Sequence, residues 1–224
     1  MEIIYTTMDF ILSAIFLLLS FPVFLLAVCL VRIDSPGRIF YFQERYGKDK
    51  KRFMIYKFRT MTEGSEGDGC PVWGTESDPR CSFIGKFLRV THIDELPQLI
   101  NVLKGEMSLV GPRPERPYFA EKFEISVSNY KMRYTIKPGL TGWSQVNGWR
   151  GDSLIKERTR FDLFYIQKRS LLFNFFILVL TIFAKPVKTA RDFNPDEINY
   201  DLTFSQEEDF SGANIPLSVP IKKA

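Results

Sequence analysis

The chain has 224 residues, 45% of them hydrophobic and 15% aromatic, and a formal net charge of +4. This length can bury one domain core and still provide an additional apolar segment. Three cysteines without ligand-like spacing and a single histidine argue against a disulfide framework, a zinc site and a histidine-based metal centre. These features are typical of a reduced domain that faces the cytosol.

The most apolar stretch, residues 10–31, contains no charged residue over 22 positions. As an α-helix it would be roughly 33 Å long, which is enough to cross a bilayer. Pro22 has no N–H for the carbonyl of Leu18, so a straight helix is not expected. The Ser20 hydroxyl could bond the carbonyl of Phe16 and help to satisfy a bent backbone. A kinked span and a re-entrant hairpin are equally compatible with these residues.

The residues around the apolar stretch predict which side of a membrane the body occupies. A cleaved signal peptide is not expected, because no Lys or Arg precedes the stretch and no small-residue cleavage pair follows it. Between residues 32 and 59, nine basic residues stand against three acidic ones. Such a basic excess stays on the cytoplasmic side and is attracted to anionic lipid by about 1 kcal/mol per residue.

Further along the chain, short strands are predicted around residues 39–43 and 53–58, after a turn at residues 35–37. Residues 62–79, rich in Gly, Ser and acids, predict a loop. Apolar residues at helical spacing predict helices in 118–130 and 153–178, and residues 171–184 favour a buried or interfacial element. Aromatic residues such as Trp143 and Tyr165 fit either core packing or a bilayer surface. The acidic segment after residue 190 predicts a loosely ordered tail.

Two adjacent carboxylates, Asp94 and Glu95, stand in "RVTHIDELPQL" among basic residues. Thr91 and Asp94 match a capping box, in which case Asp94 only caps a helix. A helix that instead starts near Asp94 and is closed by Gly105 places Pro97 in the tolerant first turn. That alternative leaves both carboxylates available for chemistry. The later "GPRPERP" predicts a rigid loop whose arginines either clamp a phosphate or are solvated in a surface turn.

Three stretches in this order resemble one known family. They are "SPGRIFYFQERYGKDKKRFMIYKFRTM", "GKFLRVTHIDELPQLINVLKGEMSLVGPRPERP" and "IKPGLTGWSQVNGWRGD". Over about residues 5–190 the chain resembles the bacterial sugar transferases, which are monotopic phosphoglycosyl transferases. The resemblance implies transfer of a sugar-1-phosphate from a UDP-sugar to polyprenyl (undecaprenyl) phosphate with release of UMP, initiating a cell-surface polysaccharide or glycoconjugate.

The same resemblance implies roles for individual residues. Asp94 would be the nucleophile that forms a covalent phosphosugar intermediate, and Glu95 would hold Mg²⁺. The residues that would neutralise phosphates are Lys57, Arg89 and Arg113, with Arg59 as an additional candidate. Membrane lipids are expected partners, nucleic acid is not, and a homodimer is left open.

The implied architecture is an α/β fold. Residues 1–32 would form a re-entrant membrane helix–break–helix bent at Ser20 and Pro22, residues 33–190 a small mixed catalytic domain with interfacial amphipathic helices, and residues 191–224 the acidic tail. The domain would lie on the cytoplasmic face of the bacterial inner membrane. It is expected to be the catalytic unit without the long N-terminal domain of some relatives.

Three positions depart from the family pattern. Pro22 follows Phe21 rather than a serine, and His92 stands where a small hydroxyl residue is usual. Asn174 replaces a common acidic residue, whose role could have moved to Asp162. Two other functions are compatible with parts of the sequence: a non-catalytic membrane-surface module in which Asp94 caps a helix, and a nucleotide-sugar hydrolase in which water replaces the lipid phosphate. The membrane segment favours a lipid acceptor over water.

Overall fold

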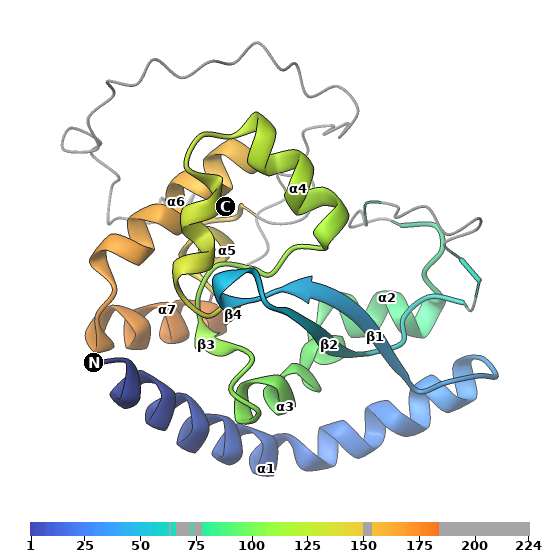
Figure 1. Cartoon of the computed structure of the whole chain (residues 1–224). Coiled ribbons are helices and arrows are strands. Elements are labelled where there is room, and N and C mark those ends of the chain that lie inside the picture. The colour runs from blue at the N-terminus through green and yellow to red at the C-terminus, as the bar shows by residue number, and fades with distance from the viewer. Residues whose placement is uncertain (63, 66–72, 74–77, 150–153, 184–224) are drawn as a thin grey trace, which may run out of the picture.

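The computed structural model describes residues 1–62, 64–65, 73, 78–149 and 154–183. The fold is mixed α/β, as predicted, with helices around two small two-stranded sheets (Figure 1). The acidic tail and most of the predicted loop 62–79 lie outside the described residues, and the division of the chain at residues 32 and 190 stays a prediction.

The elements in chain order are α1 (Glu2–Asp34), β1 (Phe40–Tyr46), η1 (Lys48–Lys50), β2 (Arg52–Phe58), α2 (Phe83–Val90), η2 (Ile93–Glu95), α3 (Gln98–Leu103), β3 (Ser108–Val110), α4 (Pro117–Ser126), η3 (Tyr130–Thr135), β4 (Gly139–Thr141), α5 (Trp143–Val146), α6 (Ile155–Lys168) and α7 (Leu171–Phe183).

The two predicted strands are confirmed as an antiparallel pair. β1 and β2 pair from Phe40 opposite Phe58 to Tyr46 opposite Arg52. The second sheet, in which β3 pairs in parallel with β4, was not predicted, because three-residue strands are too short to show a period of two. A Cβ atom at Gly139 would lie 2.0 Å from the Gly111 nitrogen. Glycine therefore permits the close approach of these two backbone segments just beyond β3.

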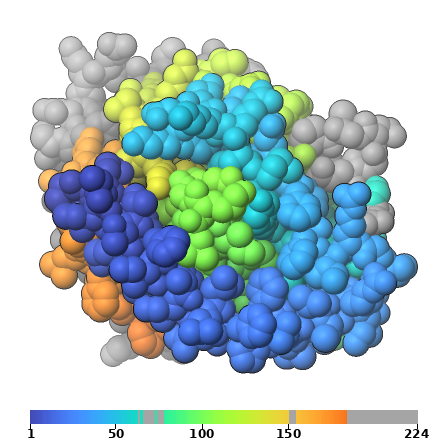
Figure 2. All heavy atoms as spheres, turned by 60° about the horizontal axis from the view of Figure 1, so that its bottom comes forward, coloured from blue at the N-terminus to red at the C-terminus, as the bar shows by residue number. Residues whose placement is uncertain are grey.

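The N-terminal apolar segment forms one helix of 33 residues that continues through Pro22. Figure 1 shows that α1 curves beneath the domain, so the expected break in helical structure is not confirmed. Ser20 does bond a carbonyl, but its hydroxyl donates to Leu17 at 3.4 Å rather than to Phe16. By length and composition α1 could cross a membrane, and it also packs on α2, α3 and β3. In Figure 2, where the bottom of Figure 1 is turned toward the viewer, the chain near residue 100 (green) lies inside the curve of α1 (blue).

A buried carboxylate near the N-terminal end of α1 binds this helix to the rest of the domain. Asp9 accepts a hydrogen bond from the Ser108 hydroxyl at 2.7 Å and from the Leu109 amide at 3.1 Å, both in β3. Because β3 leads directly into the "GPRPERP" loop, α1 and that loop are joined through one short strand.

Most predicted helices are confirmed, and their aromatic residues divide between core and surface. Trp143 and Tyr165 are each only 1% exposed, so core packing accounts for both. In α7, Ile177 is buried whereas Leu172 is 77% exposed, which fits an element with one buried face. Helix α2 was not predicted. Its Ser82 cap accepts a hydrogen bond from the Gly85 amide, a signal that the sequence carried.

Candidate active site

The adjacent carboxylates lie in a short 3₁₀ turn, η2, between α2 and α3. The Thr91 hydroxyl donates back to the carbonyls of Phe87 (2.8 Å) and Leu88 (3.2 Å), so it ends α2. The capping-box interpretation of Asp94 is therefore wrong. The helix predicted to start near Asp94 begins instead at Gln98, with Pro97 as its N-cap, and it is followed by Gly105 at φ +76° as expected.

His92 sets the direction in which the chain leaves α2 toward the dyad, Asp94 and Glu95. Its backbone is left-handed, with φ 57° and ψ 15°, immediately before η2. Histidine adopts this region more readily than most residues other than glycine, asparagine and aspartate. The departure from the family pattern thus falls at a turn with an unusual backbone, two residues before Asp94.

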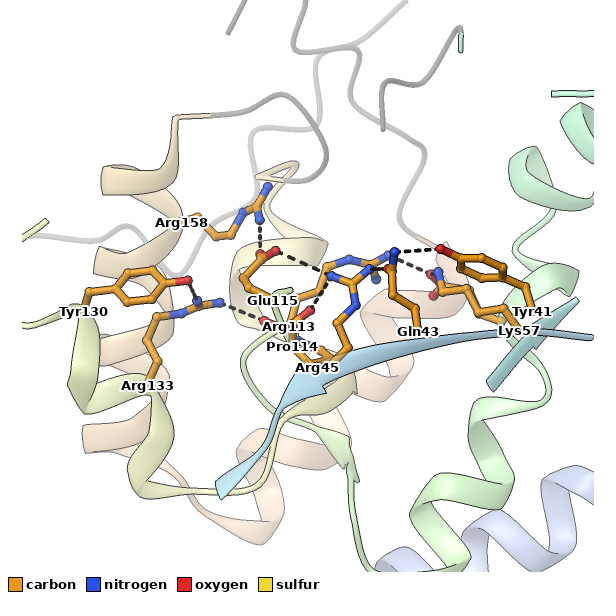
Figure 3. A network of polar contacts seen from close by, with 11 residues as sticks. Tyr41, Gln43, Arg45, Lys57, Arg113, Pro114, Glu115, Tyr130, Arg133 and Arg158 are labelled. Carbon is orange, nitrogen blue, oxygen red and sulfur yellow. Dashed lines mark hydrogen bonds and ion pairs between the residues drawn. The ribbon is translucent and has the colours of Figure 1, made fainter. Parts of the chain in front are cut away.

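Glu95 is held by two cations from distant parts of the chain. The Lys57 Nζ lies 2.6 Å and the Arg113 guanidinium 2.8 Å from the same oxygen, Oε1. Lys57 comes from the end of β2 and Arg113 from the loop after β3, and Figure 3 shows the two side chains converging. Three of the residues predicted for the site are therefore in direct contact.

Asp94 completes the cluster in a drier position. It is 6% exposed, and its Oδ2 lies 3.9 Å from the Lys57 Nζ. Burial raises the pKa of Asp94 above its ordinary value, and the charge of Glu95 adds to this against the opposing charge of Lys57. Burial would also raise the pKa of Glu95, but Arg113 and Lys57 outweigh it and hold that pKa well below its ordinary value. Two neighbouring carboxylates thus have different protonation behaviour, a pattern typical of catalytic pairs.

The remaining predicted cations lie in different surroundings. Arg89, in the last turn of α2, donates from Nε to the Thr60 hydroxyl at 2.9 Å, and its charge also acts on Asp94. Arg116 does not join Glu95, since its guanidinium lies over the Phe119 ring at 5.8 Å.

Arg59 is placed differently from a phosphate ligand. It is 7% exposed, and its guanidinium donates to the carbonyls of Ser35 (2.6 Å) and Pro36 (3.0 Å) where α1 ends. A further contact reaches the Val31 carbonyl at 3.4 Å. These carbonyls lie at or just beyond the C-terminal end of α1, where a cation suits the negative end of the helix dipole. Arg59 therefore connects the end of α1 to the end of β2, and its guanidinium is directed at backbone carbonyls and not at the Asp94–Glu95 cluster.

The donor set around Asp94 and Glu95 fits a hard cation with few protein ligands. No cluster of three or more His, Cys, Asp or Glu side chains suited to a metal occurs within the described residues. Mg²⁺ is commonly bound through one or two carboxylates, with water and substrate phosphates as the other ligands. The dyad supplies carboxylate oxygens of that kind, so the residues present fit the ion.

Sequence reasoning missed a buried polar network next to the "GPRPERP" loop, of which Figure 3 draws Arg133, Glu115 and Arg158. Arg133 pairs with Asp162 at 2.8 Å, and the Ser144 hydroxyl donates to Asp162 at 2.7 Å. Arg158 pairs with Glu115 at 2.5 Å. No local motif marks Arg133 or Arg158, because their partners are distant in sequence and only the fold brings them together.

Comparison with known proteins places the chain in a family. A model of the family described as bacterial sugar transferase matches residues 1–187. The chain belongs to the bacterial sugar transferase family. This match includes α1 and every residue of the Asp94–Glu95 cluster.

Several curated bacterial sugar transferases and related proteins are similar to the chain. The UDP-glucose:undecaprenyl-phosphate glucose-1-phosphate transferase of Escherichia coli K12 is 42% identical over 186 residues, 81% of this chain and 40% of that protein. The UDP-N-acetylgalactosamine-undecaprenyl-phosphate N-acetylgalactosaminephosphotransferase of Aeromonas hydrophila is 38% identical over 177 residues, 78% of this chain and 42% of that protein. An exopolysaccharide production protein of Rhizobium leguminosarum is 38% identical over 180 residues, 75% of this chain and 88% of that protein. The chain thus spans about 40% of the length of the first two relatives.

The third departure of this bacterial sugar transferase, Asn174, lies in a local polar contact. The Tyr165 hydroxyl lies 2.8 Å from the Asn174 Oδ1 and 3.1 Å from the Val110 carbonyl, and its single hydrogen is shared between these two acceptors. Asp162, considered as a replacement for an acid at position 174, is engaged with Arg133 and Ser144. The two positions therefore serve separate contacts.

Proposed function

We propose that this chain transfers a sugar-1-phosphate from a UDP-sugar to undecaprenyl phosphate and so initiates a bacterial surface polysaccharide or glycoconjugate. The observation that carries the proposal is the cluster around Glu95, in which Lys57 and Arg113 converge beside the buried Asp94. Two cations next to two carboxylates suit a substrate that brings negative phosphates and needs a nucleophile. The donors named for relatives carry glucose or N-acetylgalactosamine, which makes both sugars candidates.

Asp94 is the nucleophile in this proposal. One of its carboxylate oxygens attacks the phosphorus that carries the sugar, the pyrophosphate P–O bond breaks, and UMP leaves with the electron pair. A phosphate oxygen of undecaprenyl phosphate then attacks the same phosphorus, and the bond to Asp94 breaks. The second step regenerates the carboxylate and yields the lipid diphosphate sugar. A poorly hydrated carboxylate suits this role, because less water must be removed before it attacks.

The flanking residues neutralise charge. Lys57 and Arg113 bind phosphate oxygens, Arg89 adds positive charge at Asp94, and Glu95 holds Mg²⁺. When bound, the metal offsets the charge of the pyrophosphate and of the departing UMP. Because Lys57 and Arg113 already contact Glu95, substrate phosphates would compete with that carboxylate for the same two cations.

A membrane position is supported by exposed apolar side chains. On α1, Leu18 and Leu19 are more than 70% exposed, at 76% and 72%. Helix α2, which packs on α1, exposes Phe83, and α7 exposes Leu172 and Ile182. Exposed apolar side chains on three helices favour contact with lipid. The acceptor phosphate would then lie at the headgroup level, within reach of the dyad.

We propose that α1, although it is continuous through Pro22, enters the membrane from one face and does not cross it, and contacts at both of its ends support this path. At the N-terminal end, Arg169 pairs with Glu2 at 2.7 Å and lies over the Tyr5 ring at 3.9 Å. At the other end, Arg59 bonds the last carbonyls of α1. A helix that crossed the bilayer would hold its two ends roughly 30 Å apart on opposite faces, where one domain could not bind both. Both ends and the domain are therefore proposed to lie on the cytoplasmic face.

Transfer to lipid is the direct test of this function. The purified chain in nanodiscs is given Mg²⁺, undecaprenyl phosphate and each of a panel of UDP-sugars labelled in the sugar. Label in the organic phase, with many UMP released per protein only when the lipid is present, supports the transferase. Release of many UMP per protein without the lipid, with label left in water as free sugar phosphate, would indicate a hydrolase. No UMP release with any donor would indicate a non-catalytic membrane module.

A further inference from the structure

The backbone of the loop that carries Arg113 is held by hydrogen bonds from other elements of the fold. Four consecutive carbonyls, from Pro112 to Glu115, each accept a hydrogen bond from outside the loop, and the donors come from three segments, β4, η3 and β1. The donors to residues 112, 113, 114 and 115 are, in that order, the Gly139 amide (2.9 Å), the Arg133 guanidinium (2.9 Å), the Arg45 guanidinium (3.2 Å) and the Tyr46 amide (3.1 Å). Pro112 and Pro114 have no N–H of their own, so the loop offers few donors with which to hold itself.

Arg133 has every side-chain nitrogen engaged. Its Nε donates to Asp162 at 2.8 Å, one terminal nitrogen donates to the Tyr130 hydroxyl at 2.6 Å, and the other donates to the Arg113 carbonyl. The side chain is 4% exposed and Asp162 is 1% exposed. A planar guanidinium bound in three directions has little freedom to move, so it fixes the carbonyl that it contacts.

Asp162 is itself oriented by a further contact. Its second oxygen accepts the Ser144 hydroxyl at 2.7 Å, from α5, while α6 supplies Asp162 and η3 supplies Arg133. Two further elements, α5 and α6, therefore act through Arg133 on one backbone atom of residue 113. Figure 3 shows Arg133 on the side of the loop away from Lys57, with Arg113 between them.

We infer that Arg133 is a positioning residue for Arg113, setting where the Arg113 side chain meets Glu95 and the substrate phosphates. This rests on the proposed function, because it assigns Arg113 to phosphate binding. Displacing the 113 carbonyl moves the base of a side chain whose far end must match a carboxylate or phosphate oxygen. A misplacement of about 1 Å can lower an enzymatic rate on the order of 100-fold.

A double-mutant cycle separates positioning from general support of the fold. Arg133→Gln should lower kcat/KM about tenfold or more when Arg113 is present, but by no more than about twofold in an Arg113→Gln background. Thermal stability should fall by the same amount in both backgrounds. A loss of kcat/KM by the same factor in both backgrounds would overturn the inference. The control is Arg80→Gln, which removes the partner of another buried carboxylate, Asp78. It should change kcat/KM by the same factor in both backgrounds.

Two additions keep the test decisive. If Arg133→Gln does not fold, Arg133→Lys enters the same cycle, since it keeps the charge opposite Asp162 but has one nitrogen in place of three. The cycle is also measured on the affinity for UDP by calorimetry, which needs no lipid acceptor. If the parent protein binds UDP but transfers nothing, the proposed transferase function fails while the cycle on UDP affinity still supports or overturns the role of Arg133.

Discussion

Arg113 and Glu95 meet at 2.8 Å although they come from different loops, one after β3 and one before α3. Lys57 reaches the same carboxylate oxygen at 2.6 Å from the end of β2. The pairing keeps Glu95 ionised and leaves Asp94 as the less solvent-exposed and more basic carboxylate of the two. The site therefore holds two carboxylates with different charge behaviour, which suits the roles proposed for Glu95 as metal ligand and Asp94 as nucleophile.

Replacing Glu95 tests the first of these roles. Glu95→Gln keeps the shape of the side chain but removes an anionic oxygen ligand, so turnover should fall on the order of 100-fold or more and require more Mg²⁺. Turnover is measured as UMP release across a Mg²⁺ titration. Glu106→Gln, at the other end of α3, removes a carboxylate paired with Lys104 at 3.0 Å and should change turnover by no more than about twofold. Normal turnover and normal Mg²⁺ dependence in Glu95→Gln would show that the ligand assignment is wrong.

Replacing Arg59 tests whether it holds α1 or binds substrate. Arg59→Gln removes a buried charged donor from the carbonyls at the end of α1, so it should destabilise the fold by about 3 kcal/mol. The melting temperature should fall by roughly 6–12 °C, with little change in the KM for the UDP-sugar. Arg32→Gln is the matched control, because Arg32 donates to the Gly37 carbonyl at an exposed position near the same helix end. A raised KM with unchanged stability would return Arg59 to the substrate site.

The topology of α1 can be tested by cysteine labelling. In a chain without its native cysteines, single cysteines at positions 2 and 51 should both resist a membrane-impermeant thiol reagent in intact spheroplasts. Both should react after permeabilisation. Pro22→Leu removes a helix defect of about 3 kcal/mol and should increase labelling at position 2. Labelling at position 2 alone in the parent sequence would mean that α1 spans the membrane.

The sequence predicted the elements whose signals are local. The alternation in residues 53–58, the apolar length of α1 and the glycine after α3 each correspond to an observed feature. The parallel pair β3–β4 could not be predicted, because its pairing depends on a return of the chain about 30 residues later, and short strands leave little pattern. The dyad was predicted as a helix start, but Pro97 displaced the helix to Gln98 and left the carboxylates in a 3₁₀ turn.

The candidate site could be predicted only in part, because some of its contacts join residues that are distant in sequence. Adjacent acids, the two arginines of "GPRPERP" and the lysine of "YKFRTM" form visible motifs, and the structure brings Asp94, Glu95, Lys57 and Arg113 together. Arg59 belongs to one of these motifs but faces the end of α1. A linear pattern does not show which side of a strand end a side chain occupies. Arg133 carries no motif at all, and its role follows only from a contact 20 residues away in sequence.

The central claim is that Asp94 is a nucleophile, and the mass of the protein tests it most directly. Protein incubated with a UDP-sugar and Mg²⁺ but no lipid acceptor should gain the mass of one sugar phosphate on the peptide that contains Asp94. UMP should be released in matching amount, and undecaprenyl phosphate should discharge the adduct. Asp94→Asn should form no adduct, because an amide is a poor nucleophile, while still binding the donor through Lys57 and Arg113. A fully active Asp94→Asn protein, or parent protein that turns over without ever forming the adduct, would contradict the account.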